Sequence, residues 1–161
     1  MSPTFALILG LVFGLALAAG VGVGILRSRM IAPRRSRRSF DETCAAIERV
    51  VPADPEGWSL PLPAWDAYAV LEKKGVAPEN LRRLRFFFVC NPGYAAGMLR
   101  LDPSFAGMMP CTWAVYELQD GRVWLAKMNV GLLARLQPPA IAAIMGRVAA
   151  ADERFLAEVL G

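Results

Sequence analysis

The chain has 161 residues, 55% of them hydrophobic, and a formal net charge of +4. It contains no histidine and three cysteines, which excludes His-based catalytic triads, imidazole metal sites and a disulfide framework. Residues 1–38 hold six arginines and no acidic residue, whereas residues 39–161 hold 12 basic and 14 acidic side chains. The net positive charge therefore comes from residues 1–38, which we interpret as a tether, and we expect no nucleic-acid partner.

After a short N-terminus (residues 1–4), residues 5–26 carry no charge and are numerous enough to cross a hydrocarbon core of about 30 Å. A cleavable signal peptide is the alternative, but no basic residue precedes the stretch and it exceeds the usual signal core. The arginines follow the span, in residues 27–38, so the positive-inside rule places the N-terminus outside and the domain, residues 39–161, in the cytoplasm. The sequence predicts a single-pass protein of the cell (inner) membrane.

Two features of this N-terminal part indicate partners. Small residues recur every four positions along the span, a spacing that lets two membrane helices pack closely, although small residues are common in such helices: Ala6, Gly10, Gly14, Ala18 and Gly22. The arginines after the span are expected to contact lipid headgroups or to act only as a stop-transfer signal: Arg27, Arg29, Arg34, Arg35, Arg37 and Arg38.

The Arg-rich linker, residues 27–38, is expected to include a first strand within residues 30–37. Ser39 and Glu42 then form a capping-box pattern, which predicts a helix whose apolar face carries Cys44 as a core residue. Residues 52–63 are a proline-rich link in which residues 58–60 are expected to form a short strand. A second helix is predicted over residues 64–74, with Gly75 as its terminator.

The Phe-rich run 85–89 predicts a buried strand, followed by an Asn91-Pro92 helix start and a helix to Leu101. Asp102 is expected to cap the next segment. Residues 112–118 and 122–128 predict a hairpin, with Asp120-Gly121 favouring a type I′ turn. Its aromatic residues, Trp113, Tyr116 and Trp124, are expected in the core. A closing helix is predicted over residues 139–160, and Asp152 interrupts its apolar stripe, which suggests at most a partner contact.

Cys90 and Cys111 are the candidate reactive residues. Cys90 precedes a helix N-terminus, which is expected to lower its pKa. If the two thiols meet, they would form a reversible disulfide or bind a soft ligand such as Cu(I) or haem iron; a right-handed crossover between parallel strands would instead separate them. Four methionines would add thioether ligands or simply fill gaps: Met98, Met108, Met109 and Met128.

Several motifs occur in a characteristic order: residues 71–75, Cys90-Asn91-Pro92, Asp102-Pro103, Met109-Pro110-Cys111 and Asp120-Gly121. In this order they resemble the domain of unknown function 302 family over roughly residues 30–160. The resemblance implies an α+β fold, a small antiparallel sheet backed by helices of the TATA-binding-protein-like class, and pairing as dimers, with no established reaction. It marks five candidate motif residues: Cys90, Asn91, Pro92, Pro110 and Cys111. Pro33 lies where the first strand is expected, which predicts a short or lost strand.

No catalytic constellation stands out, which favours a binding role over an enzymatic one. We expect a single-span membrane protein whose cytoplasmic α+β domain is a binding or assembly module, as a homodimer or an accessory subunit of a membrane complex. The alternative is thiol-redox chemistry or cofactor binding, to a soft metal or haem, centred on Cys90 and Cys111. The expected partners are membrane lipid and either a second copy or another membrane subunit; no cofactor is identified.

Overall fold

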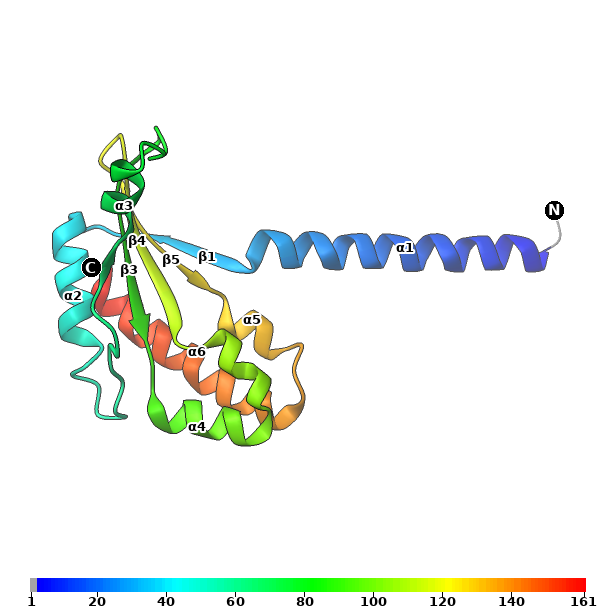
Figure 1. Cartoon of the computed structure of the whole chain (residues 1–161). Helices are drawn as coiled ribbons and strands as arrows, with labels where there is room; N and C mark the ends of the chain where they lie inside the picture. The colour runs from blue at the N-terminus through cyan, green and yellow to red at the C-terminus, as the bar shows by residue number, and fades with distance from the viewer. Residues whose placement is uncertain (1–2) are drawn as a thin grey trace. The chain divides into compact units, whose positions relative to one another are not determined.

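The computed structural model describes residues 3–161, without the side chains of residues 5–9, and the chain divides into two units, with the sequence boundary between Met30 and Ile31 (Figure 1). Helix α1 (Pro3–Arg29) makes up the first unit. Within it, Gly10–Arg29 is long and apolar enough to cross a membrane, a test that a signal sequence also passes. A Cβ atom added at Gly10, Gly14 or Gly22 would meet nothing within 4 Å apart from the helix's own backbone. Ala18 is exposed, and the side chain of Ala6 lies outside the described set.

The second unit is an α+β domain built on a five-stranded antiparallel sheet in the order β1-β5-β4-β3-β2, as expected for the fold class. Its strands are β1 (Ile31–Arg35), β2 (Trp65–Asp66), β3 (Leu81–Val89), β4 (Cys111–Leu118) and β5 (Val123–Met128). Its helices are α2 (Phe40–Val50), α3 (Ala67–Lys73), α4 (Pro92–Leu101), the 3-10 helix η1 (Pro103–Met108), α5 (Val130–Ala134) and α6 (Pro139–Val159).

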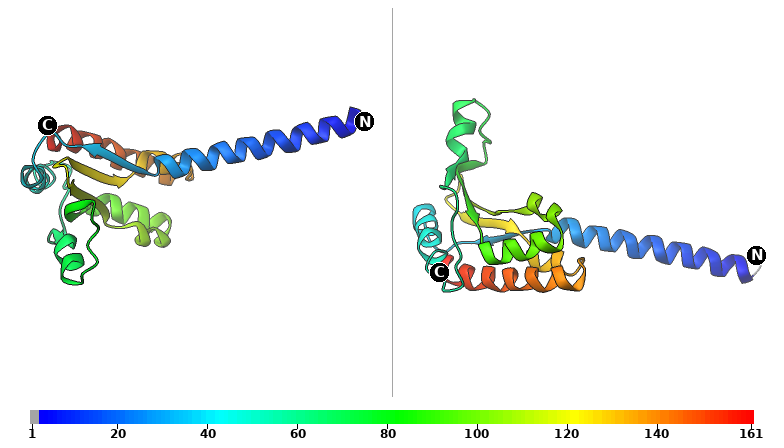
Figure 2. Two further views of the ribbon diagram at one scale, coloured as in Figure 1. Left: turned by 90° about the horizontal axis from the view of Figure 1, so that it is seen from above. Right: turned by 60° about the horizontal axis from the view of Figure 1, so that its bottom comes forward.

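Helices α2, α4 and α6 lie together on one side of the sheet, while α3 lies beyond its end (Figure 2). Residues paired directly across antiparallel strands share a face. The covered face therefore carries Phe87 beside Trp113 and Val115 beside Leu125, and all four are buried. Together with the expected apolar stripe of α2, in which Cys44 is 2% exposed, they form the main core.

The side chains on the opposite face of the sheet are half-buried or exposed. Phe86, Tyr116 and Trp124 are half-buried there, and Trp65 of β2 stacks on Phe86 with a ring-centroid distance of 5.6 Å while staying 49% exposed. The expectation that the hairpin aromatics belong to the core holds for Trp113 and is wrong for Tyr116 and Trp124. The two-residue period of a strand sends residues 113 and 116 to opposite faces.

Pro33 predicts a first strand that is short or lost; β1 is present and has five residues, so it is short and not lost. β1 pairs only with β5 and forms the edge of the sheet, where a proline without an N–H is tolerated. Two of the arginines expected at the lipid surface bond to α6 from this region. Arg34 Nη2 lies 3.1 Å from a Glu153 carboxylate oxygen, and Arg38 Nη2 donates to the Glu158 carbonyl at 3.1 Å.

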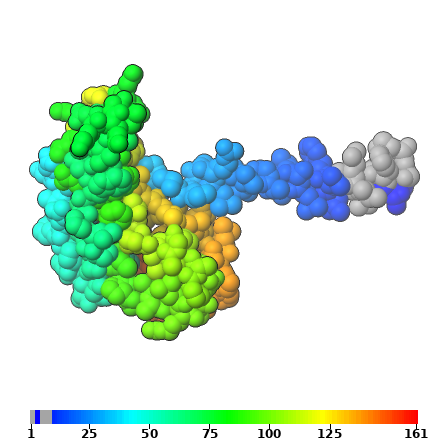
Figure 3. Space-filling model, in the orientation of Figure 1, coloured from blue at the N-terminus to red at the C-terminus, as the bar shows by residue number. Residues whose placement is uncertain are grey.

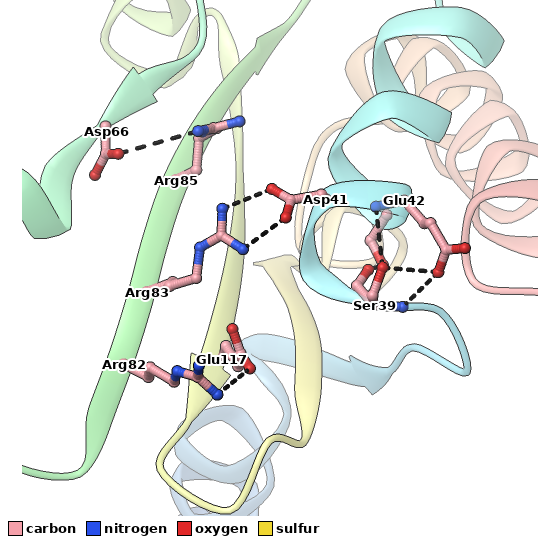
Figure 4. A network of polar contacts seen from close by, with 9 residues as sticks. Ser39, Asp41, Glu42, Asp66, Arg82, Arg83, Arg85 and Glu117 are labelled. Carbon is pink, nitrogen blue, oxygen red and sulfur yellow. Dashed lines mark hydrogen bonds and ion pairs between the residues drawn. The ribbon is translucent and has the colours of Figure 1, made fainter.

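Helix α2 begins with the predicted capping box. The Ser39 hydroxyl accepts from the Glu42 N–H, and the Glu42 carboxylate accepts from the Ser39 N–H at 2.9 Å. In the same turn of α2, Asp41 accepts two hydrogen bonds from Arg83 of β3, at 2.6 and 2.8 Å (Figure 4). The Arg83 guanidinium also lies 4.0 Å from the centre of the Phe40 ring. These contacts hold the start of α2 against β3.

Three local predictions are corrected. Within residues 58–60 there is only an isolated bridge from Ser59 to Cys90, and the short strand lies later, at Trp65–Asp66. The second helix therefore starts at Ala67, with Asp66 as its N-cap, although Gly75 ends it as expected with φ +68°. The hairpin turn is not type I′, which needs a positive φ at both central residues. Of Asp120 and Gly121, only Gly121 has one, of 78°. Instead Gly121 N–H bonds to the Leu118 carbonyl, the pattern of a three-residue loop with glycine in the left-handed position.

Candidate functional site

The domain contains a cavity of about 600 Å³ at the end of the sheet where β3 finishes and β4 begins. Its walls come from the ends of β3, β4 and β5, from α4 and η1, and from α6. Figure 3 shows the surface of α4 and η1 directly beside that of α5 and the start of α6. A small second hydrophobic core packs α4, α5 and α6 together: Met98, Val130, Ala134, Ile141 and Met145.

Helix α4 is held at the cavity by Asn91, the predicted N-cap. The Asn91 side chain accepts a hydrogen bond from Tyr94 N–H at 3.0 Å and donates one to the Glu56 carbonyl at 2.8 Å. Pro92 occupies the first turn of the helix, where its missing N–H costs nothing. Trp58 packs edge-on against Tyr94, with ring centroids 5.9 Å apart, and so closes one side of the cavity.

The two candidate cysteines lie at the same end of the sheet. β3 and β4 are antiparallel and Val89 pairs with Cys111, so the separation that a parallel crossover would impose does not arise. Both thiols are free and line the cavity. Burial raises the pKa of Cys111 to about 11, and the charge of Asp152 and the neighbouring Cys90 add to that shift. Burial also raises the pKa of Cys90, so the prediction of a lowered value is wrong: desolvation outweighs the helix N-terminus.

Sulfur is concentrated around this cavity. Besides the two cysteines, five of the chain's seven methionines line it: Met98, Met108, Met109, Met128 and Met145. Four of these are the methionines singled out from the sequence, and Met145 of α6 joins them. Pro110, the remaining motif residue, also lines the cavity and follows a cis peptide bond. The soft, polarizable lining is thus a property of the whole wall and not of two residues.

A buried ion pair supplies the cavity's charged groups. Lys127 of β5 and Asp152 of α6 both line it, and Lys127 Nζ lies 2.6 Å from Asp152 Oδ2. The residues are 7% and 1% exposed. The second carboxylate oxygen, Oδ1, is buried and accepts no hydrogen bond from any residue that the structure describes. Burial raises the pKa of Asp152, against the opposing charge and hydrogen bond of Lys127.

Within the described part of the chain, no three histidine, cysteine, aspartate or glutamate side chains cluster closely enough to hold a metal ion. The sulfur donors at this cavity are the two thiols and the methionine thioethers. Such a donor set suits a soft ion and does not suit Mg²⁺ or Ca²⁺.

The family model for "Domain of unknown function DUF302" matches residues 33–159. The chain belongs to the DUF302 family. The crystal structure of an uncharacterized conserved DUF302 protein from Bacillus stearothermophilus is similar in fold, with a TM-score of 0.65 and 20% identity over 81% of this chain and 95% of that one. An uncharacterized protein of Aquifex aeolicus (strain VF5) is 35% identical over 48 residues, 30% of this chain and 33% of the relative. The match therefore spans about a third of that relative's length.

Sequence reasoning placed Cys90, Asn91 and Cys111 at this site but did not find its charged pair. A signal for Lys127 was present: Val123, Leu125 and Lys127 alternate along β5 and all three are buried. A lysine on the inward face of a strand predicts an acidic partner. Asp152 likewise stood out on the apolar stripe of α6, and its partner proves to be within the same DUF302 domain.

Proposed function

We propose that this chain is a single-span protein of the cell membrane whose cytoplasmic DUF302 domain binds a small, largely apolar molecule. The observation that carries the proposal is the cavity of about 600 Å³ with a mostly apolar lining and few polar groups. Pockets for small ligands typically measure about 300–1,000 Å³ and have this composition. Helix α1 would hold the domain at the membrane surface, where apolar molecules are concentrated.

A matched pair of variants on α4 tests the proposal. Ala95 lines the cavity, whereas its neighbour Ala96 does not, and leucine suits a helix at either position. We expect 4-pentylphenol to bind the full chain in lipid nanodiscs, measured by tryptophan fluorescence after subtraction of partition into empty discs. Ala95→Leu should weaken binding and Ala96→Leu should not. Equal binding to all three proteins would place the probe elsewhere and contradict the proposal.

We also propose that the protein assembles in the membrane. The small residues of α1 would pack against a helix of a second copy or of another membrane subunit. Support comes from the small residues that recur every four positions along α1, among them Gly10, Gly14 and Gly22, since such a ridge would let another helix approach closely. Energy transfer between labelled chains in vesicles tests self-association. Gly14→Leu should abolish the transfer, whereas Ala19→Leu, on another face of the helix, should preserve it. Unchanged transfer in Gly14→Leu would remove this role for the small residues.

A second candidate function is binding of a soft metal ion, favoured by the placement of Cys90 and Cys111 on one methionine-rich wall. Thiolate and thioether ligands select Cu(I). Because the pKa values of both thiols are raised, Cu(I) must displace their protons and should bind more tightly as the pH rises. Competition with a chromogenic Cu(I) chelator should show loss of binding in the double variant Cys90→Ser with Cys111→Ser. Cys44→Ala, which alters only a core thiol, is the control; Cu(I) retention by the double variant would eliminate this candidate.

A further inference from the structure

The most informative feature of the cavity is its single charged pair. Lys127 and Asp152 come from different elements, β5 and α6, and both are more than nine-tenths buried. A buried ion pair in an apolar wall is expensive unless its remaining hydrogen-bonding capacity is used. Here that capacity is only partly used, because Asp152 Oδ1 accepts no hydrogen bond among the described residues.

The pair presents an acceptor and a donor side by side. Lys127 Nζ carries three N–H groups, and one of them bonds to Asp152 Oδ2 at 2.6 Å. The free acceptor, Oδ1, belongs to the same carboxylate. Both residues line the cavity, so a small rotation of the Asp152 carboxylate, whose Oδ1 is buried, would bring one polar ligand atom within reach of both a donor and an acceptor.

We propose that the Lys127–Asp152 pair is the recognition element for a hydroxyl group on an uncharged, mainly apolar ligand. The ligand O–H would donate to Asp152 Oδ1 while its oxygen accepts from Lys127 Nζ, since a hydroxyl is both donor and acceptor. The pair is neutral overall, so a ligand carboxylate or ammonium group would enter the apolar wall without a counter-charge. This inference rests on the proposed function and names the ligand class for the same cavity.

The experiment compares two probes of nearly equal shape. 4-Pentylanisole carries a methyl group in place of the hydroxyl hydrogen of 4-pentylphenol, so it has no O–H to donate. Each is titrated into the full chain in lipid nanodiscs, and the quantity measured is the ratio of their dissociation constants. The double variant Lys127→Met with Asp152→Leu removes both charges at similar volume, and Glu153→Gln, an exposed position next in the helix, is the matched control. Partition into lipid is common to all three proteins and cancels when their ratios are compared.

We expect wild type and Glu153→Gln to bind the phenol about tenfold more tightly than the anisole, the gain of one hydrogen bond to a charged group. In the double variant the ratio should fall to about one while anisole affinity is retained. Equal binding of both probes to wild type, or a preference that survives in the double variant, would overturn the inference and leave the binding function intact. If neither probe binds any of the proteins, the proposed function fails as well. Circular dichroism of each variant confirms that it is folded.

Discussion

Removing one partner of the buried ion pair should destabilise the DUF302 domain far more than removing an exposed partner nearby. Asp152→Ala leaves the Lys127 ammonium, which is 7% exposed, without its counter-charge. Breaking a buried pair in this way costs about 3–5 kcal/mol, which corresponds to a fall in melting temperature of roughly 10–20 °C for a domain of this size. Glu153→Ala breaks the exposed pair with Arg34 and should cost less than about 1 kcal/mol.

Replacing both partners separates loss of the pair from loss of one charge. Lys127→Met combined with Asp152→Leu leaves no buried charge and should recover most of the stability, because an apolar pair avoids the desolvation cost of the ions. The free energy of unfolding is measured by urea titration of the full chain in nanodiscs, followed by tryptophan fluorescence. A cost below about 1 kcal/mol for Asp152→Ala, or a double variant less stable than Asp152→Ala, would refute the reasoning.

The single variant Lys127→Met adds a pH dependence with a defined sign. Without Lys127 the remaining influences on Asp152 are burial and the negative charge of Glu153, and both raise its pKa above the ordinary 3.8. A carboxyl whose folded-state pKa is raised holds its proton more firmly in the folded protein. Relative to wild type, the stabilising contribution of the protonated Asp152 carboxyl should therefore be complete below pH 3.8 and should be lost as the pH rises through the folded-state pKa of Asp152. A stability that rises over that window relative to wild type would contradict this account.

Three further predictions concern the surroundings of the cavity. Asn91→Ala removes the cap of α4 and the bond to the Glu56 carbonyl, so it should cost about 1–2 kcal/mol of unfolding free energy; Asn91→Asp, which keeps the cap, should cost less. Both cysteines should react with iodoacetamide at pH 7 more slowly than a free thiol, because their pKa values are raised; rapid alkylation followed by mass spectrometry would contradict the observed burial. Gly121→Ala should destabilise the hairpin by about 1 kcal/mol because φ at this position is +78°, and an unchanged urea midpoint would show that the turn relaxes freely.

Local sequence signals predicted the local structure well. The capping box at Ser39, the Asn91-Pro92 start of α4 and the terminator Gly75 are all confirmed. Each depends on a side chain and a backbone group only a few residues apart, so short-range geometry decides the outcome. The hairpin shows the limit of this approach: Asp120-Gly121 correctly predicted a tight turn, but the loop is one residue longer than the type I′ form.

The site itself depended on contacts that no local signal specifies. The antiparallel pairing of β3 with β4 brings Cys90 and Cys111 to one end of the sheet, and the raised pKa of Cys90 follows from burial, which local capping rules do not include. Lys127 and Asp152 meet although 25 residues separate them.

The amino-acid sequence alone determined the apolar N-terminal segment, the positions of most helices and strands, and the family to which the domain belongs. These follow from hydrophobic periodicity, capping residues and breakers, which act over a few residues. Tertiary structure alone decided which face of the sheet is covered, that a cavity exists, and that a lysine and an aspartate share it. The physical reason is that burial and desolvation are properties of the packed domain. A lysine on a strand and an aspartate on a helix become a buried ion pair only when α6 packs against the sheet.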